Sequence, residues 1–435
     1  MKKSEAYGII VNIKSAEAGC TDIYIKNTNS FRINNIYVDV QPINENIAGE
    51  YKNRWLIKKL EAGAEWHSEK SGNNDVNDIY IDTFEPVGYY KGQKQIIDEN
   101  LYDKARGVYN GEIHHSLVWP DKDNLDKWKK EIVYEFSEFK LKVVIRFIAY
   151  GPRIAFIGHS FTGLWDSSYY YLRELAKLAG WNCRIAYSYW GGTGIAHYAG
   201  LVSGCKERAE QCDKVLESND YYDFCSFAGN SDEAVSTYTR EPGAKDYSQR
   251  TLMLEGAQIL YNKAKKKKAK CIFFVPQPYK YGFFGARCKK PWKEGNVGDI
   301  YEKDGEKYTL VMSRSQMAEA NMEWYDYMAD NIGNNIYAAP VAKAYDYIIN
   351  RYPDIIDPYL PVGNDNGDNG HQNNVGNYIA ACVYYELIFK EPVEGLGVPQ
   401  SHTWGMAGGK VTEEQAYIIQ KCVTEIMGNK LDNKY

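Results

Sequence analysis

The sequence predicts an α/β protein: a parallel β-sheet covered by helices on both faces, preceded by a smaller domain of β-strands. Two patterns support this prediction. After residue 153, short apolar segments alternate with longer segments of helical period, which is typical of a parallel sheet buried on both faces. Before residue 150, short segments rich in β-branched and aromatic residues are separated by turn residues, which indicates β-strands.

The chain has 435 residues, which is long enough for two domains. The change of pattern places a β-sandwich, as an accessory or binding domain, at residues 1–150 and an α/β domain at 151–435. Short strands at regular spacing suggest the sandwich. These strands are expected at 7–13, 22–26, 35–40, 55–58, 78–82, 131–136 and 141–148. The pattern weakens between residues 85 and 127, where we expect a long loop.

The α/β domain is predicted from five apolar strands and the helical segments between and after them. The strands are expected at 154–157, 184–189, 223–227, 271–275 and 335–338. The helices are expected at 169–179, 195–217, 250–266, 315–331, 375–389 and 413–427. Ligands of such sheets bind outside the carboxyl ends of the strands, so functional residues are expected in the segments that follow them.

Charge and composition argue against several classes of function. Lys and Arg number 52 and Asp and Glu 57, a net charge of −5, so the basic surface of a nucleic-acid-binding protein is not expected. No apolar segment approaches the roughly 18–20 residues that span a bilayer, and no signal peptide is recognised. We expect a cytoplasmic protein, with a secreted or virion-associated one as the alternative. The nine cysteines show no zinc-ligand spacing, and neither a metal nor a cofactor is expected.

The most informative segment is the apolar strand 154–157 with the Gly-His-Ser that follows it and ends at Ser160. Such a turn can hold a serine hydroxyl at the carboxyl edge of a parallel sheet. Much later in the chain, Asp368 and His371 lie just before a helical segment. Serine, histidine and aspartate are the nucleophile, the base and the orienting acid of an activated hydroxyl. These residues therefore predict a serine hydrolase.

Four segments in one order resemble the SGNH hydrolase superfamily of GDSL-type lipases and esterases. They are Ile157-Gly-His-Ser-Phe-Thr162, Trp190-Gly-Gly-Thr-Gly-Ile-Ala-His197, Phe227-Ala-Gly-Asn-Ser-Asp232 and Asp368-Asn-Gly-His-Gln-Asn-Asn-Val-Gly-Asn-Tyr378. The resemblance covers residues 152–395. It implies a flavodoxin-like three-layer sandwich, in a branch similar to carbohydrate esterases that carry an N-terminal β domain.

The resemblance implies roles for three residues. Ser160 would be the nucleophile, His371 the general base that takes its proton, and Asp368 the acid that orients the imidazole. Asp365 is the alternative to Asp368. His159 stands where the family has Asp or Asn, and we expect it to have a structural role.

An oxyanion hole is implied in the same way. Its donors would be the backbone N–H groups of Ser160 and Gly192 and the side-chain amide of Asn230, with Gly191 as the alternative to Gly192. Glycine lets the backbone approach a reacting carbonyl closely. His197, at the end of the second segment, either lines the substrate pocket or makes a structural hydrogen bond. The acidic residues 232 and 233 are interpreted as favourable charges in the first turn of a helix.

Aromatic residues make up 14% of the chain, including 38 Tyr. Tyr and Trp suit carbohydrate ligands, because a ring face stacks on the sugar while the polar tip hydrogen-bonds; genomic composition is the alternative explanation. The segment 279–292 is long and aromatic for a loop, as binding elements often are. We expect its Tyr281 and Trp292 to wall the acyl or sugar site, with packing on the β domain as the alternative.

Together these features predict an esterase that hydrolyses small acyl esters, such as acetyl esters, on a carbohydrate. The expected partner is an acylated small molecule or glycan, with no nucleic acid and no membrane. A homo-oligomer or a larger assembly is compatible with the sequence. A thioesterase and a lysophospholipase-like enzyme are further alternative functions. The alternative from another class is a non-catalytic carbohydrate-binding or assembly protein of a virion or cell surface, built on the same scaffold.

Overall fold

The computed structural model describes residues 8–17, 20–42, 53–68, 84–85, 87–95, 129–135, 140–146, 150–163, 167–230, 232–235, 249–284, 294–303, 305–360, 370–399 and 410–434. The chain forms two compact units. One contains Met1–Phe84, Asp98–Pro152 and Ala179–Arg184. The other contains Glu85–Ile97, Arg153–Leu178 and Ile185–Tyr435.

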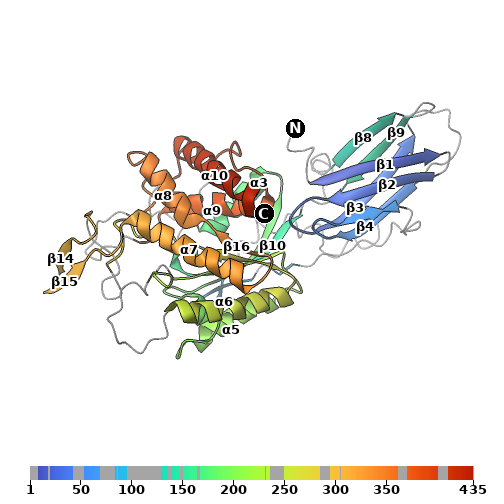
Figure 1. Ribbon diagram of the computed structural model, residues 1–435. Helices are drawn as coiled ribbons and strands as arrows, with labels where there is room; N and C mark the ends of the chain where they lie inside the picture. Colours follow the sequence, from blue (N-terminus) through green and yellow to red (C-terminus); the bar gives the residue numbers. More distant parts are fainter. Residues whose placement is uncertain are drawn as a thin grey trace. The chain divides into compact units, whose positions relative to one another are not determined.

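The described residues of the first unit form two antiparallel sheets (Figure 1). One sheet has the order β1 (Ile9–Glu17), β2 (Cys20–Asn27), β5 (Glu65–His67). The other has the order β4 (Asn53–Leu60), β3 (Ile33–Pro42), β9 (Lys140–Arg146), β8 (Lys129–Glu135). The strand expected at 78–82 lies outside the described residues.

The two sheets of the first unit pack through one face each. Along β2, Ile23 and Ile25 are buried while Lys26 is exposed, which is the alternation of a strand with one buried face. Trp55 of β4 and Trp66 of β5 lie edge to face, with ring centroids 5.9 Å apart. The predicted N-terminal β-sandwich is confirmed.

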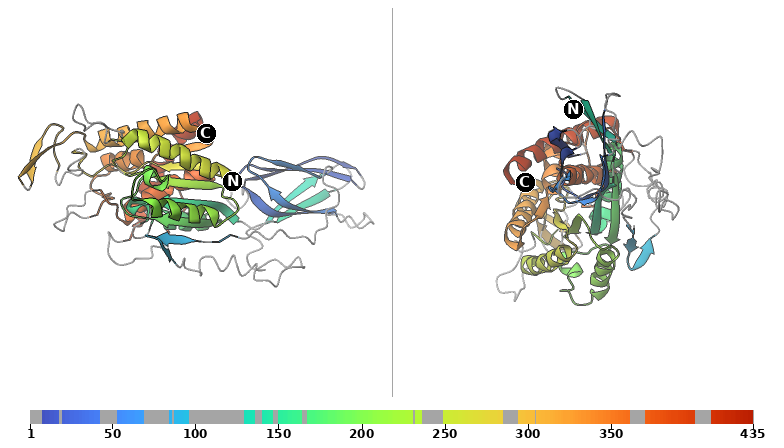
Figure 2. Two further views of the ribbon diagram at one scale, coloured as in Figure 1. Left: turned by 90° about the horizontal axis from the view of Figure 1, so that it is seen from below. Right: turned by 90° about the vertical axis from the view of Figure 1, so that its right-hand side faces the viewer.

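Among the described residues, one sheet of seven strands forms the centre of the second unit, in the order β16-β13-β12-β10-β11-β6-β7, and the first residues of β10 and β11 belong to the first unit (Figure 2). The strands are β6 (Gly88–Tyr90), β7 (Gln93–Gln95), β10 (Tyr150–Gly158), β11 (Asn182–Tyr189), β12 (Phe224–Ala228), β13 (Lys270–Phe274) and β16 (Ile336–Ala339). β10, β12, β13 and β16 pair in parallel, and β6 pairs in parallel with β11. Taken in chain order, the strands β10, β11, β12, β13 and β16 have the flavodoxin-like order 2-1-3-4-5.

Helices cover this sheet on both faces. The helices are α2 (Ser160–Gly163), α3 (Ser168–Leu178), α4 (Ile195–Tyr198), α5 (Lys206–Glu217), α6 (Gln249–Lys266), α7 (Arg314–Ile332), α8 (Val341–Arg351), α9 (Asn374–Phe389) and α10 (Glu413–Lys434). Figure 1 shows α5 and α6 on one face and α8, α9 and α10 on the other. The predicted α/β three-layer fold is confirmed. None of the helices in the described part of the chain is long and apolar enough to cross a membrane.

The layer under the candidate site is built on α9, in which every residue is buried. Tyr384 of α9 packs edge to face on Phe156 of β10, at a centroid distance of 5.0 Å. Its hydroxyl lies 2.6 Å from Oγ of Ser226 on β12. A helix that is apolar all round is typically buried, and α9 contacts β16 of the sheet and the helices α3, α8 and α10.

The structure corrects two sequence-based expectations. The single helix expected at 195–217 was wrong, because the chain forms α4 and α5 with Gly200 and Gly204 at positive φ between them. Within 85–127, where a loop was expected, β6 and β7 form a hairpin at the sheet edge. Lys91 and Gly92 in its two-residue turn both have positive φ, as a type I′ turn requires. The sequence signal was missed because the turn lacks the usual Asn-Gly or Asp-Gly pair.

Candidate active site

Ser160 lies where β10 ends and the chain turns into α2. The N–H groups of Thr162 and Gly163 donate to the carbonyl of His159, at 2.9 and 3.0 Å, which closes the turn. A Cβ added at Gly158 would lie 1.9 Å from Oγ1 of Thr162, so the turn has room only for glycine there. Ser160 is thereby held, partly exposed, at the carboxyl edge of the sheet.

The structure brings Ser160 and His371 together, with Nε2 of His371 2.8 Å from Oγ of Ser160. The two residues are far apart in the chain: Ser160 follows β10, and His371 lies just before α9. The ring of Phe161 stands perpendicular to the imidazole, at a centroid distance of 5.2 Å. With Nε2 unprotonated, the imidazole accepts the serine hydroxyl hydrogen, which is the arrangement of a nucleophile and its base.

The segment that carries His371 is fixed through its backbone just ahead of α9. The N–H of Leu360 donates to the carbonyl of His371 at 3.0 Å. Asn373 caps α9 by accepting the N–H of Gly376 at 3.1 Å. Its side-chain amide donates to the carbonyl of Tyr359 at 2.9 Å. These hydrogen bonds restrain the backbone at and after His371. They thereby keep the imidazole close to Ser160.

Two buried glutamine side chains tie the histidine segment to the serine turn. Nε2 of Gln372 donates to the backbone carbonyl of Ser160 at 2.9 Å and to Oδ1 of Asn377 at 3.1 Å. Nε2 of Gln277, which follows β13, donates to the carbonyl of Gly370 at 3.3 Å and to Oε1 of Gln372 at 3.1 Å. Neither glutamine could be recognised as part of the site from the sequence, because no local pattern marks a glutamine whose partner is a distant backbone carbonyl.

The candidate oxyanion donors follow three neighbouring strands: Ser160 comes after β10, and Gly192 and Asn230 come after β11 and β12, the strands on either side of β10. Gly192 has φ +65°, a conformation that favours glycine. Neither Gly192 nor Ser160 donates its backbone N–H to a protein acceptor within the described ranges. The backbone N–H of Asn230 donates to Oε2 of Glu233 at 2.7 Å. The loops that carry all three donors therefore follow adjacent strands at one edge of the sheet.

His159 has a structural role in the described geometry. Its side chain is 2% exposed, and Nδ1 accepts the backbone N–H of Phe161 at 3.2 Å. The ring proton is therefore on Nε2, which donates to the carbonyl of Gly229 at 2.7 Å. Burial lowers the pKa of His159 to about 4. The neutral imidazole thus joins the serine turn after β10 to the loop after β12.

The structure places His197 in a cap of α4. Its Nδ1 accepts the backbone N–H of Gly194 at 3.1 Å. The side chain is half-buried, and burial, with a smaller effect of the Arg208 cation, lowers its pKa. This hydrogen bond is the structural one of the two roles expected for His197, and its place in substrate binding stays a prediction.

The remaining predicted residues lie around the segment after β13 or outside the described ranges. Tyr281 is partly exposed, with Nζ of Lys280 5.7 Å from its ring centre. Its neighbours Tyr279 and Phe283 are buried. Asp368, its alternative Asp365 and Trp292 all lie outside the described residues. Within the ranges described, no group of three or more His, Cys, Asp or Glu side chains could hold a metal ion.

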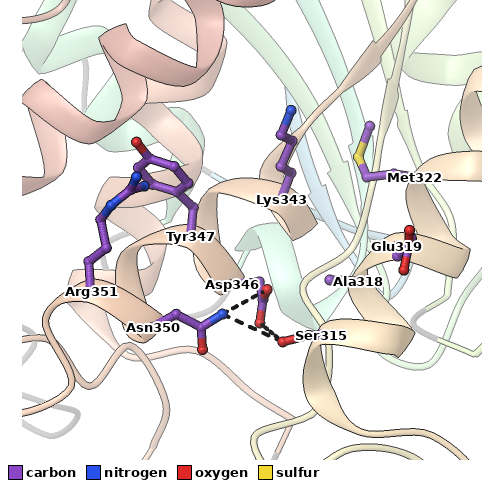
Figure 3. A pocket seen from close by; sticks show the side chains of 9 residues that line it. All are labelled: Ser315, Ala318, Glu319, Met322, Lys343, Asp346, Tyr347, Asn350 and Arg351. Atoms are coloured by element: carbon purple, nitrogen blue, oxygen red, sulfur yellow. Dashed lines mark hydrogen bonds between the residues drawn. The ribbon is translucent and has the colours of Figure 1, made fainter.

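A hollow of about 490 Å³ lies between α7 and α8, away from the predicted site residues (Figure 3). Asn350 donates to Oδ2 of Asp346 at 3.0 Å, and the hydroxyl of Ser315 donates to the same carboxylate at 2.8 Å. The guanidinium of Arg351 lies 3.4 Å from the ring centre of Tyr347. These polar groups of the hollow bond to one another, and none of the predicted catalytic or oxyanion residues lines it.

No family model matches the sequence, and no curated protein matches it. Among solved structures, the chain is similar to a DUF4886 family protein from Bacteroides uniformis, with 13% identity, a TM-score of 0.44 and coverage of 65% of this chain and 96% of that one. It is also similar to an acetylxylan esterase from Geobacillus stearothermophilus, with 16% identity, a TM-score of 0.35 and coverage of 55% and 95%. An α/β hydrolase enzyme from the metagenome of Lake Arreo, Spain, has 16% identity, a TM-score of 0.33 and coverage of 54% and 94%. Because these TM-scores lie below 0.5, the function of this chain is inferred from its own residues.

Proposed function

We propose that this protein is a serine esterase of the SGNH type that hydrolyses small acyl esters, in particular acetyl esters, carried by a carbohydrate. The observation that carries the proposal is the 2.8 Å distance between Nε2 of His371 and Oγ of Ser160. This pair lies at the carboxyl edge of a flavodoxin-like sheet, beside the point where the strand order reverses between β10 and β12, and that is where such sheets bind their ligands.

In the first half of the proposed reaction, His371 takes the hydroxyl proton while Oγ of Ser160 bonds to the ester carbonyl carbon. The carbonyl oxygen becomes an oxyanion, which the N–H groups of Ser160 and Gly192 and the amide of Asn230 bind. The bond from carbon to the alcohol oxygen then breaks, and the imidazolium gives its proton to the leaving alcohol.

In the second half, a water molecule attacks the acyl-enzyme carbonyl and gives its proton to His371. The bond to Oγ of Ser160 breaks, the serine regains the proton, and the carboxylic acid is released. Asp368 is proposed as the acid that holds Nδ1–H of the imidazole, with Asp365 as the alternative. This assignment comes from the sequence resemblance.

The aromatic surroundings of the serine turn support a carbohydrate as the alcohol. The ring of Tyr189 packs on Gly163, where an added Cβ would lie 2.6 Å from it. The rings of Tyr189 and Tyr90 stack, with centroids 4.7 Å apart, and both are only half-buried. Tyrosines that combine a ring with a polar tip suit sugars. The N-terminal β-sandwich is proposed as an accessory or binding domain for the same acylated glycan.

The test is turnover of p-nitrophenyl acetate by the wild type and by Ser160→Ala, with acetate release from acetylated xylan and mannan measured in parallel. We expect Ser160→Ala to lose at least about 10³-fold in kcat/KM, as removal of a serine nucleophile does. Acetate release from the glycans would separate a carbohydrate deacetylase from a general esterase.

Equal turnover by the two proteins would exclude Ser160 as the nucleophile. A folded wild type that is inert on both substrates, and on longer acyl esters, would instead favour the non-catalytic binding protein on this scaffold. Circular dichroism of both proteins controls for folding.

A further inference from the structure

A buried carboxylate lies behind two of the proposed oxyanion donors. Glu233 is 6% exposed and lies in the turn that follows β12. The prediction that Glu233 lies in the first turn of a helix was wrong. Residues 232–235 form a turn, and the side chain of Glu233 is buried. The carboxylate is directed at backbone N–H groups of its own loop and of a second one.

The hydrogen bonds of Glu233 join two loops that are distant in the chain. Oε2 accepts the N–H of Asn230 at 2.7 Å and the N–H of Ile195 at 3.3 Å. In return, the N–H of Glu233 donates to the carbonyl of Asn230 at 3.1 Å. Asn230 carries the proposed amide donor, and Ile195 follows three residues after Gly192.

Close approach of the two loops depends on glycine at two positions. A Cβ added at Gly194 would lie 2.0 Å from Oε1 of Glu233. A Cβ added at Gly229 would lie 1.9 Å from the hydroxyl oxygen of Tyr325 and 3.0 Å from Oε2 of Glu233. The carboxylate therefore fills a space between the loops that any larger residue at 194 would close.

We propose that Glu233 is a positioning residue, whose carboxylate holds the Gly192 loop and the Asn230 loop at the spacing that the oxyanion donors require. This inference rests on the proposed esterase function. Above its pKa of about 7, the carboxylate suits the task because it only accepts hydrogen bonds, and bonds from N–H groups to a charged acceptor are about twice as strong as neutral ones. A glutamine in its place could accept the N–H groups of Asn230 and Ile195 only on its neutral carbonyl oxygen, and its NH2 group would then stand at the place of Oε1, where it can only donate.

The test compares Glu233→Gln with Glu386→Gln as the matched control. Glu386 is also a buried glutamate, 2% exposed, and accepts the N–H of Val393 at 2.8 Å and the hydroxyl of Thr424. It lies on α9 and touches neither loop. The measurements are hydrogen exchange of peptides that cover residues 190–198 and 226–235, and kcat and KM for p-nitrophenyl acetate.

We expect Glu233→Gln to speed exchange in both peptides and to lower kcat by about 10- to 100-fold, somewhat less than the loss of a whole oxyanion donor. KM should stay within about twofold, because the donors act on the transition state rather than on the bound ester. Glu386→Gln should leave both peptides and kcat unchanged. A purely structural glutamate would alter global stability without this split between kcat and KM.

A second variant covers the case in which Glu233→Gln does not fold. Gly194→Ala places a methyl group against the carboxylate and should give the same two-peptide exchange and the same fall in kcat. Gly428→Ala is its control, because an added Cβ there meets no atom within 4 Å.

Unchanged exchange, or faster exchange in one peptide alone, would overturn the proposal whatever the activity. Faster exchange in both peptides with an unchanged kcat would overturn the positioning role. If the wild type is inert, the esterase proposal fails and the positioning role fails with it, while the exchange result still shows whether Glu233 couples the two loops.

Discussion

The two halves of the proposed site are held by different chemistry. The Ser160–His371 half is fixed by the amide groups of Gln372 and Gln277, which are neutral at every physiological pH. The loops of the oxyanion half are held by two buried titratable groups: the carboxylate of Glu233, and the imidazole of His159, which joins the loop after β12 to the serine turn. Hydrogen bonds made by a glutamine amide do not change with pH, because the amide does not titrate. The imidazole and the carboxylate each change charge when they titrate. The support that the two glutamines give to the nucleophile should therefore be constant with pH, whereas the support that Glu233 and His159 give to the oxyanion loops should respond to it.

The largest effect is expected from removing the base on the nucleophile side. His371→Ala should lower kcat/KM by about 10³-fold or more, because the serine then has no group to take its proton. The melting temperature should change little, since His371 is partly exposed. The double variant with Ser160→Ala should lose no more than either single one, as residues that act as a unit do. A further loss of the same size in the double variant would show that the two act separately.

The next effect is on the oxyanion side, where burial raises the pKa of Glu233 from 4.5 to about 7. Between these values the folded chain binds more protons than the unfolded chain, so this contribution to stability is present below pH 4.5 and lost as pH rises through 7. A shift of this size corresponds to about 3 kcal/mol. The unfolding free energy of the wild type relative to Glu233→Gln should fall by this order between pH 4.5 and 8, measured by urea unfolding.

His159 supplies the control of opposite sign. Burial lowers its pKa from 6.5 to about 4, so its contribution is present above pH 6.5 and is lost as pH falls through 4. The unfolding free energy of the wild type relative to His159→Gln should therefore fall on acidification. The same direction in both variants would contradict the assignment of these two groups.

A smaller effect is expected from the amide support of the nucleophile. Gln372→Met keeps the side-chain volume but leaves the carbonyl of Ser160 and Oδ1 of Asn377 without this donor. Leaving buried acceptors unpaired costs about 1–3 kcal/mol, measured as the free energy of unfolding in urea. The loss should be equal at pH 5 and pH 8, because no titratable group is removed. A loss that changes with pH would show that the two halves are not supported differently.

The smallest effect is expected from Tyr281, which lies outside both halves. Tyr281→Ala should raise KM for acetylated xylan by about 2- to 10-fold, the size of one aromatic contact. KM for p-nitrophenyl acetate should stay unchanged, because that ester carries no sugar. Equal KM for xylan in both proteins would show that Tyr281 does not wall the sugar site.

Much of the scaffold was predictable because its signals are local. The strands β10 to β13 and β16 are apolar segments bounded by turns, and the strand–Gly-His-Ser–helix turn places Ser160 within a few residues of β10. The pairing of Ser160 with His371 followed from segment order, and the structure brings the two side chains together. The β6–β7 hairpin was not predicted, because its strands are three residues each and its turn pair is Lys91-Gly92.

By itself, then, the sequence determined the layers, the strand that carries Ser160, and the histidine that could meet it. Hydrophobic periodicity and turn residues act over a few positions, so they can be recognised from the sequence without knowing the fold. Only the tertiary structure decided that Gln372 binds the serine carbonyl and that Glu233 binds two loops rather than a helix start. Each of these polar side chains is buried, and a buried polar group must be paired. Its partners are backbone groups that become neighbours only when the strands that carry them assemble into one sheet.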